Sequence, residues 1–362
     1  GLVQAQADAT QLEAIADLTA VRLVRRPYLP APFAVTSEGV ALINASAWQT
    51  AGVTGTGVKI AVLDTGFAGY PARQSGGDLP VSLTTNFAAG AEGDSNHGAA
   101  VAEVVYDVAP GAELRLVKYS TDVDFAVAAD DAANWGAKVI VHAMGFFQGG
   151  PGNGTGAVNA KVNAVTAGGV LWVQAAGDQA QRHWTGASSD GPNNEWVGFN
   201  PAASHKITAT QGAPVEIVVK WNDPYGASAN DYDLLLCATD ACLNAADVLA
   251  DSRDPQDGTQ NPEERITLTG GPVGGAPFTG DYFLKVKRFK ATGTSTFHIH
   301  VTSPNPSPNV LSFTPSSAEK SLAIPADNAN AFVIGAVNHA SATVIEPFSS
   351  LGPTIDGRIK PD

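Results

Sequence analysis

Hydrophobic positions in the first half of the chain follow two alternating patterns. Short runs that are apolar at nearly every position and rich in β-branched residues are typical of strands buried on both faces of a parallel sheet. Segments rich in Ala and Val at helical spacing lie between these runs. The alternation predicts right-handed βαβ crossovers and an α/β fold with a doubly wound parallel sheet. The predicted strands are residues 58–64, 113–118, 138–144 and 170–176, and the predicted helices are residues 97–106, 123–135 and 157–167.

The pattern changes after about residue 184, where Pro, Gly, Asn and Asp become frequent. Short runs of alternating hydrophobicity then lie between turn residues, as in an antiparallel sandwich or jelly roll. Residues 332–337 return to the buried-strand pattern, so the all-β module is predicted to be inserted within the α/β domain and not appended to it. The predicted strands of the module are residues 215–221, 231–238, 265–269, 281–289, 295–302 and 310–313.

A chain of 362 residues is long enough for more than one domain. Its front part contains a short helical pattern at residues 11–18 and a Pro-rich link at residues 27–32. We predict four segments: a front segment with its linker (1–45), the first part of the α/β domain (46–189), the inserted module (190–317) and the continuation of the α/β domain (318–362).

The charge balance excludes two classes of partner. The chain has 21 basic and 35 acidic residues, a net charge of −14, and such a surface repels nucleic acid and anionic membranes. No apolar run approaches the roughly 18 residues of a membrane-spanning helix. The first residues lack the basic start and apolar core of a signal peptide, and the first residue is not Met. We therefore interpret the sequence as a processed or excised piece.

Two cysteines, Cys237 and Cys242, lie in a stretch of β-type sequence. A local disulfide across a turn is one interpretation and would fit an oxidising, extracellular compartment. Two small unpaired core residues are the other. No pair of histidines lies near them at zinc-binding spacing, so we do not expect a zinc site.

Candidate chemistry begins at Asp64, which ends a predicted buried strand and is followed by Thr65 and Gly66. A carboxylate at this position faces the crevice at the carboxyl edge of a parallel sheet. The motif alone is not specific, because Asp-Thr-Gly also occurs in aspartic proteases and such an Asp can simply cap the next element.

His97 opens an Ala/Val-rich helical segment and is followed by Gly98, which allows another backbone to approach closely. A lone histidine is usually structural. His97, however, follows Asp64 by about the length of one crossover plus a loop, so the two side chains can meet at adjacent strand ends. The carboxylate would then orient the imidazole as a general base.

With these motifs in order, the sequence resembles the subtilisin-like serine proteases (subtilases, peptidase S8). Asp64-Thr65-Gly66 resembles the aspartate motif of that family, and His97-Gly98 resembles its histidine motif. The chain order, with Asp before His and Ser expected last, is also that of subtilisin. Three further segments match: residues 109–112 after the histidine helix, residues 175–177 at the specificity pocket, and residues 348–362 ahead of the serine motif.

The resemblance implies a secreted endopeptidase that hydrolyses peptide bonds of protein or peptide substrates and needs no cofactor. The serine motif is expected beyond Asp362, and Ser349 and Ser350 belong to the preceding motif. The piece itself is then expected to be inactive, to expose apolar surface, and to be unstable or to associate. The front segment resembles the tail of an inhibitory propeptide, with cleavage expected before about residue 45. The oligomeric state stays open.

Two positions depart from the family pattern. Asp178 occupies the oxyanion position, where the family has Asn; an ionised carboxylate offers no donor, whereas a protonated one could still donate. Ala143-Met144-Gly145 replaces the usual Ser-Leu-Gly of the strand that binds extended substrate through its backbone. The resemblance assigns the substrate cleft to Ala143, Met144, Gly145, Ala175, Ala176 and Gly177.

The inserted module resembles the jelly-roll modules that accompany secreted bacterial peptidases. Its acidic loop offers Asp223, Asp231 and Asp233 as candidate ligands of a structural calcium ion, and a solvated turn is the simpler interpretation. The alternative to a peptidase is a non-catalytic pseudo-protease or binding protein that uses this module to hold a partner.

Overall fold

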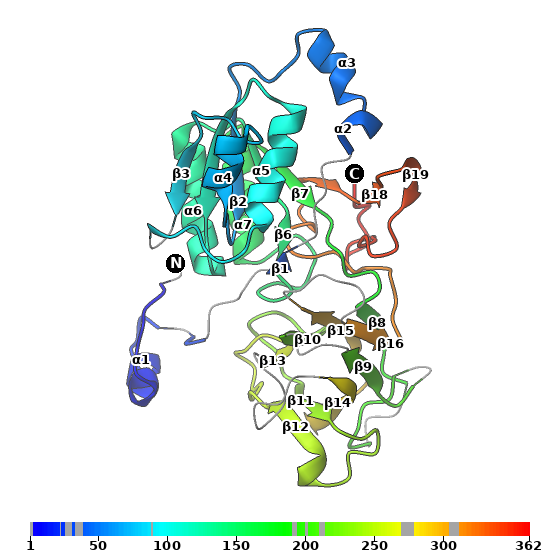
Figure 1. Ribbon diagram of the computed structural model, residues 1–362. Coiled ribbons are helices and arrows are strands. Elements are labelled where there is room, and N and C mark those ends of the chain that lie inside the picture. Colours follow the sequence, from blue (N-terminus) through cyan, green and yellow to red (C-terminus); the bar gives the residue numbers. More distant parts are fainter. Residues whose placement is uncertain are drawn as a thin grey trace.

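A six-stranded parallel sheet forms the centre of the α/β domain in the computed structural model of the chain (Figure 1). The structure describes residues 3–21, 23–25, 31–32, 39–87, 90–189, 194–199, 202–209, 214–268, 279–303 and 311–362. The strand order is β17-β7-β5-β2-β4-β3. The strands are β2 (Lys59–Asp64), β3 (Thr84–Phe87), β4 (Glu113–Lys118), β5 (Val139–His142), β7 (Leu171–Ala175) and β17 (Phe332–Ile334).

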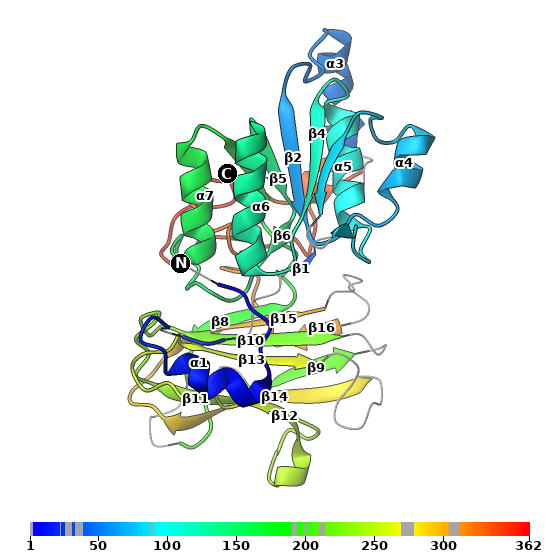
Figure 2. The same cartoon turned by 90° about the vertical axis from the view of Figure 1, so that its left-hand side faces the viewer.

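Helices cover both faces of this sheet, which explains why its central strands are apolar on both sides (Figure 2). Ala61 and Leu63 of β2 pack in one core with helices α6 (Asp122–Trp135) and α7 (Ala157–Ala167). Val62 faces the other way and packs in a second core with α5 (His97–Val108). The predicted doubly wound parallel sheet is confirmed.

The inserted module is a sandwich of two antiparallel sheets, with strand orders β13-β10-β15-β8 and β12-β11-β14-β9-β16. Its apolar residues form one core between the sheets. The first strand of the sandwich begins at His183, ahead of residue 190, where the sequence pattern predicts the start of the module. The strands are β8 (His183–Ala187), β9 (His205–Ala209), β10 (Val215–Trp221), β11 (Asp231–Cys237), β12 (Val248–Ser252), β13 (Glu263–Leu268), β14 (Gly280–Lys290), β15 (Thr296–Thr302) and β16 (Leu311–Thr314).

The chain leaves the parallel sheet after β7 and returns to it at β17, which pairs with β7. The module is therefore an insertion between two neighbouring strands, as the sequence pattern indicates. A small apolar cluster of Phe147, Ala175, Val218 and Ala323 joins the sheet to the sandwich. Nearby, the buried Lys220 of β10 donates to the carbonyl of Gly150 at 3.5 Å.

The remaining elements are short. A two-residue strand β1 (Ala31–Pro32) pairs antiparallel with β6 (Met144–Gly145), which directly follows β5. The described residues contain no helix long and apolar enough to cross a membrane. The other short elements are η1 (Ala9–Gln11), α1 (Leu12–Ala16), α2 (Gly39–Leu42), α3 (Ala45–Thr50), α4 (Tyr70–Gly76), η3 (Ala245–Asp247), β18 (Val337–Asn338) and β19 (Ser341–Ile345).

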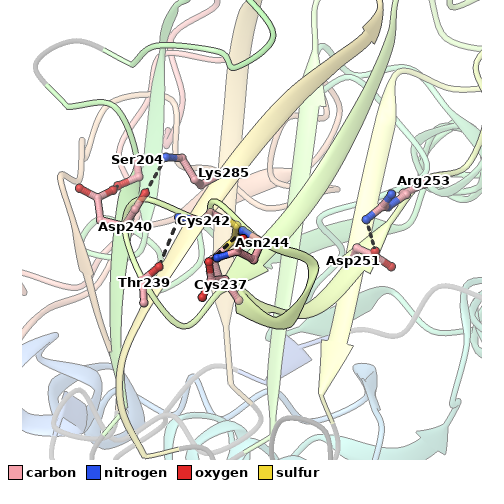
Figure 3. The surroundings of a disulfide bond; sticks show 10 residues. Ser204, Cys237, Thr239, Asp240, Cys242, Asn244, Asp251, Arg253 and Lys285 are labelled. Carbon is pink, nitrogen blue, oxygen red and sulfur yellow. Dashed lines mark hydrogen bonds and ion pairs between the residues drawn. A yellow bond between two sulfur atoms is a disulfide. The ribbon is translucent and has the colours of Figure 1, made fainter.

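A disulfide joins Cys237 to Cys242, with the Cα atoms 5.8 Å apart (Figure 3). Cys237 ends β11, and the chain turns back through Cys242, whose φ of 48° lies in the left-handed region. Both residues are buried and form a small cluster with Leu235. The partly buried Trp196 packs against this cluster. Of the two interpretations of these cysteines, the structure contains the bridged one.

Candidate active site

Asp64 and His97 lie in direct contact at the carboxyl edge of the parallel sheet. The Oδ2 atom of Asp64 is 2.7 Å from Nδ1 of His97. The other carboxylate oxygen, Oδ1, accepts from the backbone N–H groups of Thr65 at 2.7 Å and Gly66 at 3.3 Å. Asp64 is fully buried and His97 is 9% exposed, so the carboxylate is shielded while the imidazole reaches the surface of the site.

Two glycines make this contact possible. A Cβ atom at Gly98 would lie 2.5 Å from Cβ of Asp64, and one at Gly66 would lie 2.5 Å from the carbonyl oxygen of Ser95. Side chains at these positions would therefore push the start of α5 away from the end of β2. The backbone N–H of Gly98 also donates to the carbonyl of Gly66 at 2.9 Å. The glycines thus bring the histidine helix within hydrogen-bonding distance of the aspartate strand.

The contact fixes the position of the imidazole proton. A carboxylate accepts only, so Nδ1 of His97 carries the hydrogen that points to Asp64. In the neutral ring, Nε2 then carries the lone pair and is the nitrogen that acts as a base. When Nε2 takes up a proton, the adjacent carboxylate stabilises the imidazolium that forms. This arrangement is suited to the removal of a proton from a weakly acidic nucleophile.

The segments that the sequence assigns to the substrate cleft lie side by side. His142 of β5 pairs with Gln174 of β7, so Ala143–Gly145 and Ala175–Gly177 leave the sheet at neighbouring positions. β6 accepts an added antiparallel strand, because Ala31 pairs with Gly145 and Pro32 pairs with Met144. The front segment of the same chain therefore pairs with one edge of β6.

Asp178 is 5% exposed, and both of its carboxylate oxygens accept hydrogen bonds. Oδ1 accepts from Nε2 of Gln179 at 2.6 Å, and Oδ2 accepts from the guanidinium of Arg182 at 2.7 Å. Burial raises the pKa of Asp178, and the charge of Arg182 opposes the rise. Both side-chain partners are thus donors, and Asp178 presents no amide donor of the kind that Asn would supply.

The segment of residues 348–350 lies against the segment that carries Asp178. The hydroxyl of Ser350 accepts from the N–H of Gln179 at 2.9 Å, and the N–H of Ser350 donates to the carbonyl of Gly177 at 2.9 Å. Both Ser349 and Ser350 are buried. The N–H of Ala336 donates to the hydroxyl of Ser349 at 3.0 Å. The two serines therefore hold neighbouring loops together.

A buried polar network that the sequence pattern does not predict lies against Met144 and Ala175. It is formed by Tyr119, His142, Trp172 and Gln174. All four residues are fully buried. The hydroxyl of Tyr119 lies 2.7 Å from Nε2 of His142, and Nδ1 of His142 lies 2.7 Å from Oε1 of Gln174. Two polar residues inside otherwise apolar strand patterns were the available signal.

The candidate calcium ligands lie apart from this site, in the sandwich. The carboxylate of Asp223 closes a turn by accepting from Ser228, Ala229 and Asn230 at 2.8–3.0 Å. Asp231 and Asp233 are buried on β11, and burial raises the pKa of each. Among the residues that the structure describes, no three His, Cys, Asp or Glu side chains form a group suited to a metal ion. Calcium binding stays a prediction.

An aspartate that orients a histidine at the carboxyl edge of a doubly wound sheet places the chain among α/β proteins equipped for acid–base catalysis. Comparison with known proteins makes the class specific. Residues 55–214 match the profile of the subtilase family, peptidase S8. This part of the chain is similar to the subtilase family of serine peptidases.

Subtilisin BL of Lederbergia lenta is 32% identical over 165 residues, which are 42% of this chain and 56% of that protein. Subtilisin Savinase of the same organism is 30% identical over 154 residues, which are 39% of this chain and 55% of that protein. The chain thus spans a little over half the length of these curated relatives.

The structure of the Clostridium perfringens CspB protease is similar in fold, with a TM-score of 0.53 and 15% sequence identity. The similarity covers 90% of this chain and 80% of that chain. It therefore extends over both the parallel sheet and the inserted sandwich.

Proposed function

We propose that the chain is the larger part of a secreted endopeptidase that hydrolyses peptide bonds through an Asp-His-Ser triad. The observation that carries the proposal is the 2.7 Å contact between Asp64 and His97, next to a strand that accepts an antiparallel peptide. Asp64 holds Nδ1–H of His97, and Nε2 takes the proton of a serine hydroxyl. That serine is supplied by a segment outside residues 1–362.

The chemistry then follows the two-step path of acyl transfer. The serine oxygen attacks the peptide carbonyl, and His97 delivers its proton to the leaving amine to give an acyl-enzyme. Water, deprotonated by the same histidine, releases the carboxylate product. Substrate binds as a strand added to β6, so Gly145 and its neighbours recognise mainly the backbone of the peptide.

The front segment acts in this proposal as the tail of an inhibitory propeptide. Its strand β1 takes the place on β6 that an extended substrate would occupy. The guanidinium of Arg25 forms an ion pair with the buried carboxylate of Asp122 at the start of α6, which anchors the segment further back. The disulfide between Cys237 and Cys242 supports secretion, because such bridges persist in oxidising compartments.

A second candidate is a pseudo-protease that binds peptides without cleaving them. Asp178 favours this alternative, because its ion pair with Arg182 occupies the position where the family has an amide donor. Strand addition at β6 would then serve to hold a partner, and the sandwich could contribute to that binding. The two candidates differ in turnover and not in fold.

Hydrolysis of an unfolded protein substrate by the full-length protein decides between them. The comparison uses the wild type, His97→Ala, and His339→Ala as a matched control at an exposed histidine. We expect activity in the wild type and the control and a loss of at least about 1,000-fold in His97→Ala. A wild type without hydrolytic activity, although folded and able to bind peptide, would favour the pseudo-protease.

A further inference from the structure

The buried network behind the cleft has a defined arrangement of hydrogens. Nε1 of Trp172 can only donate, and it lies 3.1 Å from Oε1 of Gln174. The side-chain nitrogen of Gln174 donates to the carbonyls of Met144 at 2.8 Å and Ala175 at 3.1 Å, which can only accept. Both ends of the Gln174 carboxamide are therefore assigned by their partners.

The assignment extends to the histidine and the tyrosine. Oε1 of Gln174 also accepts from Nδ1 of His142, so that nitrogen carries the hydrogen. Nε2 of His142 then accepts from the hydroxyl of Tyr119. Burial lowers the pKa of His142 to about 4, which agrees with a neutral ring. The network is fully bonded, as a buried polar group requires.

The network connects structures that serve the proposed reaction. Met144 belongs to β6, and Ala175 ends β7, so the side chain of Gln174 bonds to both walls of the substrate cleft. At its other end, the N–H of Tyr119 donates to the carbonyl of Asp64 at 3.0 Å. The rings of Phe125 and Trp172 enclose His142, with centroids 5.2 and 5.7 Å away.

The contact with Met144 has a specific consequence for strand addition. Peptide groups point alternately to the two edges of a strand. β6 has a peptide partner on one edge, where β1 pairs with it. The hydrogen bond from Gln174 fixes the direction of the Met144 carbonyl and so keeps the two-residue strand extended. The backbone groups of the next residue, Gly145, then point toward the paired peptide. A strand this short has few backbone bonds of its own to fix it.

We propose that Gln174 is a positioning residue for the peptidase reaction: its carboxamide, which donates to the carbonyl of Met144, holds β6 ready to pair with an extended peptide. The role rests on the proposed function, since it concerns binding of the peptide that the triad would cleave. Gln174 touches neither the reacting atoms nor the peptide in this assignment. It acts through the backbone of β6.

The variant that isolates this role is Gln174→Glu, compared with Trp172→Phe and Tyr119→Phe. An ionised glutamate still accepts from His142 and Trp172 but has no hydrogen for the carbonyl of Met144. The two controls each remove another hydrogen bond of the network and leave the bond to Met144. All three perturb the same buried cluster, so a purely structural role would affect them alike.

Hydrogen exchange in the full chain of residues 1–362 gives a readout that needs no activity. At pH 8, we expect exchange at the β6 amides to rise about tenfold in Gln174→Glu, the effect of one hydrogen bond, relative to the amides of β10. The controls should leave this ratio unchanged. At lower pH, protonation of the glutamate restores a donor, and the ratio should return toward the wild-type value. Equal changes in all three variants would overturn the proposal.

A second readout uses the active full-length protein. Gln174→Glu should raise KM about tenfold with kcat within about twofold, while the controls keep the wild-type KM. A wild type without activity would contradict the proposed function and leave the exchange result to decide the role of Gln174. If Gln174→Glu does not fold, exchange of the wild-type Gln174 side-chain amide decides: we expect it to be as slow as the β6 backbone. Exchange as fast as that of the exposed Gln6 would overturn the proposal.

Discussion

The contact between Asp64 and His97 depends on residues that carry no chemistry. Gly98 lies against Cβ of Asp64, and Gly66 lies against the backbone of Ser95. The acid, the base and the first glycines could be named from the sequence, because each follows a recognisable strand end or helix start. The partners of Asp178 could not, because Gln179 and Arg182 belong to no motif and reach the carboxylate only through the local turn.

Gly98→Ala should separate the aspartate from the histidine. The new methyl group would lie 2.5 Å from Cβ of Asp64 and 2.7 Å from the carbonyl oxygen of Gly66, so α5 must shift. We expect loss of the low-field Nδ1–H resonance of His97 in the proton NMR spectrum of the chain. Gly39→Ala is the matched control, since nothing lies within 4 Å of a Cβ atom there. An unchanged resonance in Gly98→Ala would contradict this account of the site.

Asp178→Asn should increase turnover in the full-length protein. The amide would supply a donor where negative charge develops, and one such donor is worth roughly 100- to 1,000-fold in kcat. The same change leaves the buried Arg182 without its counter-ion, so we expect a lower melting temperature as well. The measurement is kcat at a temperature where both proteins are folded. Unchanged turnover would show that Asp178 is not at the oxyanion position.

At the scale of elements, the sequence predicts the helices and strands that have a clear hydrophobic period. It does not predict the strands that form only because they pair with a neighbouring strand. α7 and β10 have the predicted bounds, because each presents a clear apolar face or run. β9 was not predicted: its histidine and lysine obscure the pattern, and its position is set by pairing with β14 and β16. β6 is similar, since two residues become a strand only through their partner β1.

Glu264 on β13 should make the sandwich less stable at alkaline pH. Burial raises the pKa of this carboxyl to about 8, above the usual value of 4.5. Its contribution is therefore favourable below pH 4.5 and is lost as the pH rises toward 8, where the unfolded chain is ionised and the folded chain is not. Ser252 and Gln256 bond to it but do not neutralise its charge.

Glu264→Gln removes this pH dependence. In urea unfolding at pH 8, we expect the variant to be more stable than the wild type by on the order of 1–3 kcal/mol, and at pH 4.5 we expect no difference. The exposed Glu113→Gln serves as the control at both pH values. If the difference in unfolding free energy between the wild type and Glu264→Gln is the same at pH 4.5 and at pH 8, this assignment of the pH dependence to Glu264 is wrong.

For the whole molecule, the junction between the sheet and the sandwich is rich in buried bases. The ring of His183 packs against that of His300 in a tilted arrangement, with centroids 4.6 Å apart, and Nε2 of His183 lies 3.3 Å from Nδ1 of His298. The ring of His300 also packs against that of Phe147 of the α/β domain, tilted and with centroids 4.8 Å apart. Lys220 faces the same cluster. These groups are compatible with the packed junction when the histidines are neutral.

The junction should therefore weaken in acid. Burial lowers the pKa of His183 to about 3, and burial also lowers the pKa values of His298 and His300 well below 6.5. Their contribution to stability is complete above pH 6.5 and is lost as the pH falls from 6.5 through these lowered values, by about 1.4 kcal/mol per pH unit for each histidine.

His300→Phe should reduce that slope in urea unfolding between pH 6.5 and 4.5, because it removes one of the three bases and retains an aromatic ring beside Phe147. His339→Ala, at an exposed position, should leave the slope as it is. An identical slope in His300→Phe and the wild type would show that the junction does not set the acid sensitivity.

Several large apolar side chains in the last part of the chain are exposed. Phe332 and Ile334 of the edge strand β17 are about half exposed, and Ile359 is 88% exposed. The instability expected of residues 1–362 alone stays a prediction. The fold could be predicted from hydrophobic periodicity, and the pair of Asp64 and His97 could be predicted from the order of the motifs along the chain. The network of Tyr119, His142, Trp172 and Gln174 required the structure, because its members come from two separate strands and a loop.

In the proposed function, Asp64 and His97 activate a serine nucleophile. Labelling of the full-length protein with a fluorophosphonate, followed by mapping of the modified peptide, tests it most directly. We expect a single modified serine outside residues 1–362, and at least about 1,000-fold slower labelling in His97→Ala. Absence of labelling in the folded wild type, modification at Ser349 or Ser350, or labelling that does not depend on His97 would contradict the claim.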